Sequence, residues 1–573
     1  METAHLSVMK LGGRMKNKYK FLDYLLIIGI WVLIFGKNMF SHMLFVDYTY
    51  STFFDFWKVL STTNLHYSYL LDILKLVLAP FNLIYLTFTL SILISMLISY
   101  FYIKKMFKDK EMLFVILFSL IFFFNPFVYS RIMIGQLGVL LAYLLLPVYL
   151  YYLFNLFENN LERKSIIKVA IAYTIIALFS IHFFLLNFFI FLIASFCYRD
   201  KIKPIKYAKI FGIFVLLLIL LNSFWLQSLF SNQIFSTINS EHESFFAPKM
   251  SVDVSAAAKI LGMWGFWREA GYITTFNTMN VLVWYFLLTV LILLLISGYY
   301  FSNPDKKSKI FYSLFWVGLI LGIGISHPYT GVIFDWLFSH IPFFNGLRDS
   351  HKLVSFIALA YAYFIPTTIL KIRDRINKKY LKVSLIVFSI GFILIYTYPL
   401  IFLSNQIKSA EYPQNYYEIN NYLENQEITG NIIYLPWGTY FTYNWTFGTS
   451  SDGRIAVPIN QIVKNNVIGG PDEFGSADSL TSNIGNCLSN ESMLCLEEQG
   501  VQYVLKDKCA YYPDSYSFVN SSEVYSSECI DIYRLDNKIN AEKNTFPLNF
   551  ILWYLISFLT IVFLIFYLRK SGK

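Results

Sequence analysis

Long apolar runs that alternate with polar loops are the feature that most constrains the fold of this 573-residue chain. A helix that spans a bilayer needs about 20 apolar residues, with a usual range of about 17–25. Backbone groups cannot stay unpaired in lipid, so such runs predict membrane-spanning helices. We expect twelve of them, near residues 21–38, 83–103, 112–128, 137–154, 168–180, 183–198, 210–229, 280–301, 310–326, 353–370, 383–402 and 547–568.

The loops between these runs are basic and non-basic by turns. Loops rich in Lys and Arg stay in the cytoplasm. The pattern therefore predicts a multi-pass protein of the plasma membrane, with twelve crossings and both termini in the cytoplasm. Seven basic clusters at every second gap hold 29 of the 46 Lys and Arg residues, within residues 10–20, 104–110, 163–168, 199–209, 306–309, 371–382 and 569–573.

Residues 168–198 form one apolar stretch with basic flanks on both sides. A single helix would place one flank on the wrong side of the membrane. We therefore expect two short helices that meet at residues 180–182. The alternative is one long tilted helix, with an odd number of crossings elsewhere.

The formal net charge of +10 has its origin in the cytoplasmic clusters, which face anionic lipid head groups. No stripe of Lys and Arg interleaved with aromatic residues occurs in a soluble segment, which is the pattern that nucleic-acid binding needs. We expect membrane lipids and no nucleic acid as partners.

One long segment, residues 403–546, breaks the apolar pattern. It carries eight Lys and Arg against 18 Asp and Glu, and the topology makes it extracytoplasmic. Its spacings predict a helix over 416–423 and strands over 431–437, 501–505 and 529–534, which is an α/β domain. The chain thus divides into an α-helical transmembrane domain at 1–402, with long outer loops at 39–82, 230–279 and 327–352, the α/β domain at 403–546, and a last transmembrane helix with a basic tail at 547–573.

Four of the five cysteines lie in this outer domain, which suggests disulfides. Four cysteines allow three connectivities. Local spacing favours the pairs Cys487–Cys495 and Cys509–Cys529, and the other pairings stay open.

A polar residue beside a spanning helix is a functional candidate, because burying it there is costly. Asp47 follows an apolar stretch directly after the first helix. Partial desolvation there favours the protonated carboxyl and suits the group to act as a general base. The alternative is a solvated loop carboxylate or a helix cap.

The third and fourth runs meet at a segment that contains Pro126, Arg131 and Gln136. Pro126 breaks a helix, and we expect Arg131 at the outer surface, where its guanidinium can clamp a phosphate. The alternative is an interfacial Arg that snorkels to water. Gln136 is either a substrate contact or part of a tight turn. His182 either bonds a phosphate or a sugar, or is a satisfied histidine at a hairpin tip.

Two further outer segments carry candidates. Trp264 lies in an aromatic loop, where it stacks on a sugar or, as we favour, anchors the loop at the membrane interface. Arg348, Asp349 and Lys352 directly precede an apolar helix, where an anion meets both cations and a helix N-terminus. The alternative is a charged collar at the interface.

At these residues the chain resembles the GT-C superfamily of polytopic glycosyltransferases, which use polyprenyl-phosphate-linked sugars. Within it, the chain looks like the AftD-like arabinofuranosyltransferases and the YfhO-like membrane proteins. The resemblance covers most of the chain through short motifs: Asp47, residues 125–147, His182, residues 347–352 and residues 431–437.

The resemblance implies a transfer reaction and roles for the candidates. A sugar would pass from a polyprenyl-phosphate donor to an envelope glycan, glycolipid or protein-linked acceptor on the outer face, with Asp47 as general base. The departing phosphate needs fixed positive charge or a metal ion. Arg131, Arg348 or Lys352 would supply the charge, and His182 would bind the donor phosphate through a hydrogen bond. The acceptor would contact Gln136, Asp349, Trp264 and Trp437, although a strand end packed in a core is the favoured interpretation of Trp437.

Some members of this class use a divalent cation, and Asp47 can offer it a hard oxygen ligand. Many members have two adjacent acids in this loop, whereas here Tyr48 follows Asp47 and the next acid is Asp55. We therefore assign no cofactor and keep a divalent cation as an alternative.

Two other classes stay open. A lipid or polysaccharide transporter, or a flippase, would bind its substrate near the bilayer midplane, whereas the ionisable residues here cluster at the outer face. A non-catalytic anchor or assembly protein would bind surface glycans through its outer domain and would not need the chemistry of Asp47.

Overall fold

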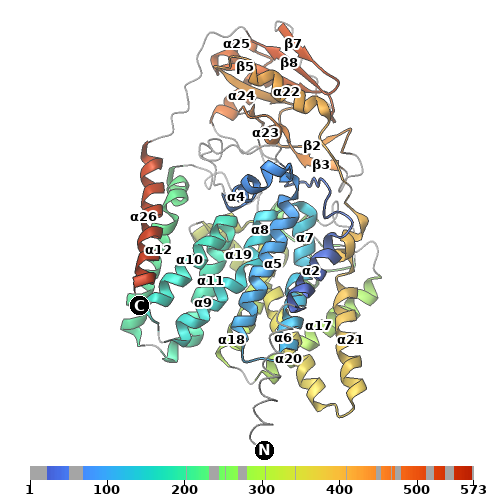
Figure 1. Ribbon diagram of the computed structural model, residues 1–573, viewed down its shortest axis with the longest axis vertical. Helices are drawn as coiled ribbons and strands as arrows, with labels where there is room; N and C mark the ends of the chain where they lie inside the picture. Colours follow the sequence, from blue (N-terminus) through green and yellow to red (C-terminus); the bar gives the residue numbers. More distant parts are fainter. Residues whose placement is uncertain are drawn as a thin grey trace, which may run out of the picture.

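The chain forms a bundle of long helices that carries a small α/β domain at one end (Figure 1). We call this second part the sheet domain. The computed structural model describes residues 22–50, 69–159, 161–201, 203–231, 244–248, 250–251, 253–268, 280–302, 305–341, 343–407, 409–446, 453–465, 467–471, 479–511, 522–535 and 548–570.

Ten helical stretches within these residues are long and apolar enough to cross a membrane. Two further helices of the bundle have 14 and 17 residues. All twelve predicted runs thus contain a helix. The helix Leu22–Phe35 is shorter than its predicted run at 21–38, whereas the helix Arg163–Phe179 is longer than its predicted run at 168–180. The bundle helices are α2 (Leu22–Phe35), α5 (Thr87–Met106), α6 (Met112–Phe123), α7 (Pro126–Ile134), α8 (Leu137–Leu144), α9 (Leu146–Glu158), α10 (Arg163–Phe179), α11 (Ile181–Tyr198), α12 (Pro204–Ser231), α17 (Val281–Phe301), α18 (Lys306–Ile323), α20 (Val354–Arg375), α21 (Lys379–Tyr396) and α26 (Leu548–Lys570).

The apolar stretch at 168–198 is broken at Ser180, as predicted. Ser180 is extended, with φ −157° and ψ 118°, so α10 ends before it and α11 begins after it. The two helices pack against each other, and the hydroxyl of Tyr173 donates to the carbonyl of Phe184 across the pair. The expected pair of helices that meet at residues 180–182 is confirmed, and α10 begins at Arg163, before the start of its predicted run.

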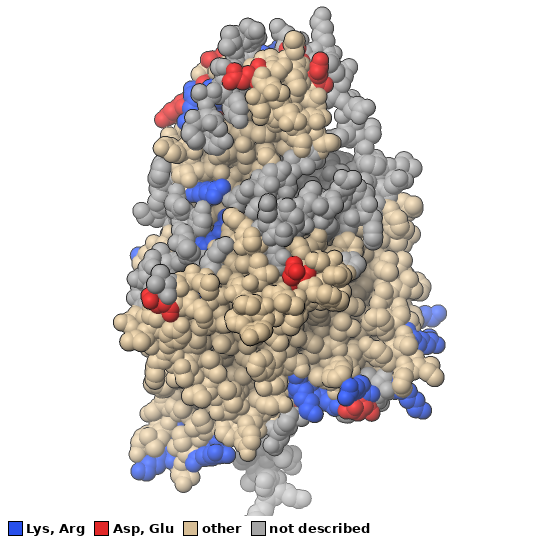
Figure 2. Space-filling model, turned by 180° about the vertical axis from the view of Figure 1, so that it is seen from behind, with Lys and Arg blue, Asp and Glu red and all other residues tan. Residues whose placement is uncertain are grey.

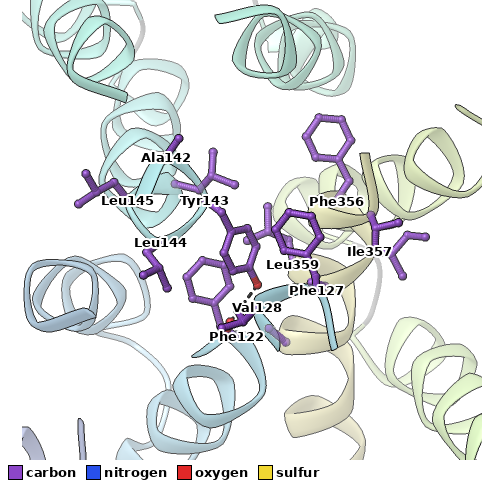
Figure 3. Packing of buried hydrophobic residues seen from close by; sticks show 14 of the residues in the cluster. Phe122, Phe127, Val128, Ala142, Tyr143, Leu144, Leu145, Phe356, Ile357 and Leu359 are labelled. Carbon is purple, nitrogen blue, oxygen red and sulfur yellow. Dashed lines mark hydrogen bonds between the residues drawn. The ribbon is translucent and has the colours of Figure 1, made fainter. Parts of the chain in front are cut away.

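The break between α6 and α7 follows from Pro126, which has no N–H to give to the carbonyl of Phe122. Two side chains replace that donor: the Tyr143 hydroxyl at 2.9 Å, drawn in Figure 3, and Nδ2 of Asn125 at 2.8 Å. The side-chain oxygen of Asn125 caps α7 by accepting from the N–H of Val128 at 3.1 Å. The chain can therefore turn inside the apolar core without leaving an unpaired carbonyl.

Helix α20 is the central helix of the bundle, and its membrane span is fully buried. It packs against α6, α17 and α18. A Cβ at Gly298 of α17 would lie 2.2 Å from the carbonyl oxygen of Phe364 of α20. Glycine is therefore required where these two helices meet, as is usual for close helix pairs in membranes.

Helices α12 and α26 form a pair at one side of the bundle (Figure 1). The hydroxyls of Ser223 and Ser557 lie 2.8 Å apart and share a hydrogen bond across the pair. Figure 2 shows Lys and Arg gathered at the end of the bundle away from the sheet domain, with a broad uncharged belt above them. This separation of charge is the pattern expected for a chain that spans a bilayer.

The sheet domain contains a five-stranded sheet of order β4-β1-β5-β8-β7 and a three-stranded sheet of order β3-β2-β6. Strand β1 is parallel to β4 and β5, whereas β5 with β8, β7 with β8, and both pairs of the small sheet are antiparallel. The strands are β1 (Asn431–Leu435), β2 (Tyr440–Tyr443), β3 (Arg454–Ala456), β4 (Val467–Ile468), β5 (Val501–Asp507), β6 (Ala510–Tyr511), β7 (Ser522–Ser526) and β8 (Ile530–Arg534).

Two cores cover the two faces of the larger sheet. Ile432 and Tyr434 of β1 belong to the core that includes α22 (Gln414–Glu424) and α23 (Ile459–Ile462). Ile433 and Leu435 point the other way, into the core that includes α24 (Ser479–Ser489) and α25 (Met493–Glu498). Alternation along the strand produces this division, and the predicted α/β character of the segment is confirmed.

Disulfides tie both cores. Cys487 pairs with Cys495 and Cys509 pairs with Cys529, with Cα–Cα distances of 5.4 and 4.9 Å. These are the pairs that local spacing favours. Shorter helices complete the chain: α4 (Tyr69–Leu78), α14 (Ala256–Leu261), α19 (Pro328–His340), and the 3₁₀ turns η1 (Ala79–Phe81), η2 (Ile84–Leu86), η3 (Arg199–Lys201), η5 (Gly324–Ser326), η6 (Phe344–Leu347), η7 (Ser350–Leu353) and η8 (Tyr398–Asn405).

Candidate active site between the bundle and the sheet domain

Asp47 lies in the loop that follows α2, and its side chain keeps 20% of its exposure. Its N–H donates to the carbonyl of Ile134, the last residue of α7, at 2.8 Å. The loop crosses directly over Gly135, which has φ +82° and where a Cβ would lie 2.5 Å from the Cβ of Phe45. Only glycine tolerates both that backbone angle and that approach. The end of α7 thus fixes the backbone of Asp47.

Gln136 joins Asp47 to the interior of the bundle. Its side-chain Nε2 donates to Oδ2 of Asp47 at 3.0 Å, and its Oε1 accepts a hydrogen bond from Nη1 of Arg131. Gln136 is half-buried. One amide therefore contacts both the carboxylate and the guanidinium.

Arg131 is fully buried, which corrects the expectation that it lies at the outer surface. Because α7 continues as a helix after Pro126, Arg131 points into the bundle and not toward water. Its Nη1 donates to Oδ2 of Asp349 at 2.9 Å, and its Nη2 lies 3.0 Å from Nδ1 of His351. The guanidinium also lies over the ring of Phe266, 4.6 Å from its centroid. A buried charge needs this set of partners.

Asp349 compensates two cations at once. It is 2% exposed, and the same Oδ2 that accepts from Arg131 lies 3.1 Å from Nζ of Lys352. Burial opposes the ionisation of Asp349, but the charges of Arg131 and Lys352 outweigh it and hold the pKa of that carboxyl below its usual range. The three residues form a buried triad with a net charge of +1.

His182 and Arg348 are close to this triad and less buried than its members. Both are half-buried. His182, the second residue of α11, lies within electrostatic reach of Lys352, Asp349, Arg348 and Arg131. The guanidinium of Arg348 lies 4.9 Å from the ring centroid of Phe246. The residues proposed to hold a phosphate are thus brought together from α7, α11 and the segment before α20.

Sequence reasoning did not assign a role to Arg268, which is nevertheless near Asp47. Its Nη1 lies 3.8 Å from Oδ1 of Asp47, and its side chain is nearly buried. The guanidinium lies 4.4 Å from the centroid of Trp267 and 5.4 Å from that of Tyr440 on β2. One feature of the sequence could have pointed to Arg268: it lies in a predicted outer loop, where basic residues are scarce.

Trp264 and Trp437, the two tryptophans named as candidate acceptor contacts, pack in or against hydrophobic cores. Trp264 is 1% exposed and meets Tyr129 edge to face in the bundle core, so our preferred interpretation as an anchor at the membrane interface is wrong. The α14 segment turns inward and carries Trp264 with it. Trp437 packs against Gly485 of α24 in a core of the sheet domain. The structure therefore brings neither indole to the carboxylate of Asp47 through a described contact.

The residues around Asp47 bear on the question of a metal ion. In the part of the chain that the structure describes, no three His, Cys, Asp or Glu side chains gather where they could hold a metal. The described partners of the Asp47 carboxylate are an amide and a guanidinium. Asp55, the next acid of the loop, lies outside the described residues.

Comparison with known proteins identifies the fold. No family model and no curated protein matches the sequence. Among solved structures, the arabinofuranosyltransferase AftD from Mycobacteria matches with a TM-score of 0.59 and 13% identity over 91% of this chain, and its R1389S mutant in class 1 matches with a TM-score of 0.52 and 12% identity over 90%. The chain spans only 40% and 41% of these two chains. The oligosaccharyltransferase AglB from Archaeoglobus fulgidus matches at a TM-score of 0.35, with 10% identity over 85% of this chain and 65% of that one, which is too distant to support an argument.

The arrangement defines a polytopic membrane protein whose fold is similar to that of AftD, one of the proteins that the sequence resemblance named. Its polar residues form one connected group at the bundle end that carries the sheet domain. The group offers a partly exposed carboxylate at one end and several cations at the other, which are the elements that acid–base and anion-binding chemistry require.

Proposed function

We propose that this protein is a membrane glycosyltransferase that moves a sugar from a polyprenyl-phosphate donor to an envelope glycan, glycolipid or protein-linked acceptor. The observation that carries the proposal is the hydrogen-bonded chain from Asp47 through Gln136 and Arg131 to Asp349. In a fold similar to that of AftD, these hydrogen bonds connect the partly exposed carboxylate of Asp47 to a group of cations.

Asp47 acts as the general base. Its carboxylate takes the proton of the acceptor hydroxyl while that oxygen forms a bond to the anomeric carbon of the donor. The bond between the anomeric carbon and the phosphate oxygen breaks, and the phosphate leaves with the electron pair. The hydrogen bond from Gln136 and the ion pair with Arg268 orient the carboxylate for this step.

The departing lipid phosphate is stabilised by fixed positive charge. Arg348 and His182 are half-buried and would contact the phosphate directly, Arg348 with its charge and His182 with a ring N–H, with Lys352 behind them. Arg131 is fully buried and already paired with Asp349. Its part is therefore to contribute charge and to hold Asp349 and Gln136 in place.

The sheet domain and the site would face the outside of the cell. This orientation follows from the basic clusters, which gather at the opposite end of the bundle and would face the cytoplasm with both chain termini (Figure 2). Two disulfides in the sheet domain suit an oxidising exterior.

The test is mass spectrometry of lipid-linked and surface glycans from a deletion strain, complemented with the wild type or with Asp47→Asn. We expect the deletion to remove a sugar that the wild type restores and Asp47→Asn does not. Immunoblotting of membranes shows that both proteins are made at equal levels. The missing mass would identify the donor sugar.

Two results would contradict the proposal. If Asp47→Asn restores the glycans fully, Asp47 is not the base. If deletion changes no glycan under conditions where the protein is made, a lipid or polysaccharide transporter, or a surface-glycan anchor, becomes the better description.

A further inference from the structure

The loop that carries Asp47 is shared between two hydrophobic cores. Met43 and Phe45 are buried in the core of the bundle. Leu44 and Tyr50 are buried in the core of the sheet domain, at 0% and 3% exposure. Because neighbouring side chains of an extended segment point in opposite directions, the loop lies between the two parts and belongs to both.

Backbone hydrogen bonds fix the loop from both sides. On the bundle side, the N–H of Asp47 donates to Ile134 at 2.8 Å. On the sheet-domain side, the N–H of Ala456 in β3 donates to the carbonyl of Val46 at 2.9 Å. Val46, which directly precedes Asp47, is therefore held by a strand of the sheet domain.

An aromatic contact closes the loop three residues beyond Asp47. The rings of Tyr50 and Tyr412 are stacked, with centroids 4.4 Å apart. The hydroxyl of Tyr412 donates to the carbonyl of Tyr50 at 2.8 Å, and the N–H of Tyr412 donates to the hydroxyl of Tyr50 at 3.3 Å. Tyr412 lies two residues before the start of α22, so this contact ties the loop to the frame of the sheet domain.

A third link reaches the carboxylate itself. Tyr440 of β2 lies against the guanidinium of Arg268, which pairs with Oδ1 of Asp47. Strands β2 and β3 are paired, with Tyr440 opposite Ala456. One small hairpin thus contacts Asp47 through the backbone at Val46 and through the side chain of Arg268.

From these contacts we propose that the sheet domain positions the general base, with Leu44, Tyr50 and Tyr412 as positioning residues that act through Asp47. The inference rests on the proposed function and adds to it that the domain is part of the catalytic site. A displacement of about 1 Å at a reacting group can cost about 100-fold in rate. Loosening the loop should therefore lower kcat while leaving the donor KM unchanged, since the cations lie on other elements.

The experiment compares Leu44→Ala with Leu423→Ala in the purified full-length protein. Both leucines are fully buried in the same core, but Leu423 lies near the far end of α22. Transfer from a synthetic polyprenyl-phosphate sugar is measured together with thermal unfolding. We expect similar losses of melting temperature in both variants, about a 10–100-fold lower kcat in Leu44→Ala alone, and an unchanged donor KM in both.

A milder pair covers the case in which Leu44→Ala does not fold. Tyr412→Phe deletes one hydroxyl, and Tyr422→Phe deletes the equivalent group of α22, which donates to Val524 at 3.5 Å. We expect kcat to fall several-fold in Tyr412→Phe and not in Tyr422→Phe. If the variants near Asp47 keep the kcat of their controls while the wild type is active, the positioning role is wrong. If the wild type itself transfers no sugar, it is the proposed function that fails.

Discussion

Gln136 lies between Asp47 and Arg131, donating to the carboxylate of the first at 3.0 Å and accepting from the guanidinium of the second. An amide is suited to this place because its rigid, uncharged group offers both a donor and an acceptor. The proposed base and the buried cation are therefore held by the same residue.

Replacing Gln136 should impair catalysis without unfolding the protein. Gln136→Ala removes both hydrogen bonds of a half-buried group, and we expect kcat to fall about 10–100-fold, because the carboxylate loses its orientation. Gln136→Glu should be more damaging, since it puts a second negative charge beside Asp47. The control is Gln406→Ala, whose side chain accepts from Tyr129 at 2.7 Å. If Gln136→Ala keeps the wild-type kcat, the hydrogen bonds of Gln136 to Asp47 and Arg131 are not needed for catalysis.

The buried pair of Arg131 and Asp349 should make a large contribution to stability when one partner is removed. Asp349→Asn leaves two buried cations without their counter-charge, and we expect about 3–5 kcal/mol of destabilisation. The triple variant Arg131→Met, Asp349→Leu and Lys352→Met removes all three charges and should regain much of that stability, but not activity. Thermal unfolding in detergent and a transfer assay measure the two effects. An unchanged melting temperature in Asp349→Asn would contradict the pairing.

Hydropathy and charge were sufficient to predict the membrane helices, because a bilayer imposes a minimum apolar length and sorts basic loops to one side. They did not predict the course of the chain after Pro126. The hydropathy of an apolar run is the same whether its helix ends at the surface or the chain turns back into the bundle. The turn depends on the hydroxyl of Tyr143, which is 21 residues away from the carbonyl of Phe122 that it satisfies.

Several residues of the connected polar group were singled out from the sequence, but the contacts between them were not predicted. Arg131 and Asp349 are 218 positions apart, and nothing in either local sequence indicates that they form a buried pair. Arg131 was expected at the surface because an Arg next to a helix break is usually solvated. Arg268 was not assigned because an Arg after a tryptophan is equally typical of a membrane interface.

Arg348 should contribute to donor binding more than to folding, because it is half-buried and borders the cationic group. We expect Arg348→Ala to raise the KM for a polyprenyl-phosphate sugar about 10-fold, with a small change in kcat, and Arg348→Lys to fall between the two. The control is Arg373→Ala near the end of α20, where Arg373 pairs with Glu111 at 2.8 Å. Equal KM values in the wild type and Arg348→Ala would exclude a phosphate contact. An equal rise in KM in Arg348→Ala and Arg373→Ala would indicate a general electrostatic effect.

Asp507 should make the stability of the sheet domain depend on pH. Its carboxylate accepts hydrogen bonds from the hydroxyls of Tyr416 and Tyr434, and from the N–H groups of Cys509 and Ala510. Burial raises the pKa of Asp507 to about 6, although these hydrogen bonds oppose the rise.

The direction of the effect follows from the two states. In the unfolded chain the carboxyl loses its proton near pH 4, whereas the folded domain keeps it until about pH 6. The contribution of Asp507 is therefore full below pH 4, falls as the pH rises from 4 to 6, and is constant above. At about 1.4 kcal/mol per pKa unit, the loss is roughly 3 kcal/mol.

The measurement is thermal unfolding of the full-length protein between pH 4 and 7.5, for the wild type and Asp507→Asn. Trp445, which lies against Tyr443 with ring centroids 5.2 Å apart, provides a fluorescence signal from this core. Other groups titrate in both proteins, so the difference between the two curves isolates Asp507. We expect the wild type to gain stability relative to Asp507→Asn as the pH falls from 6 to 4. A difference that does not change with pH would show that Asp507 stays ionised in the folded domain throughout this range.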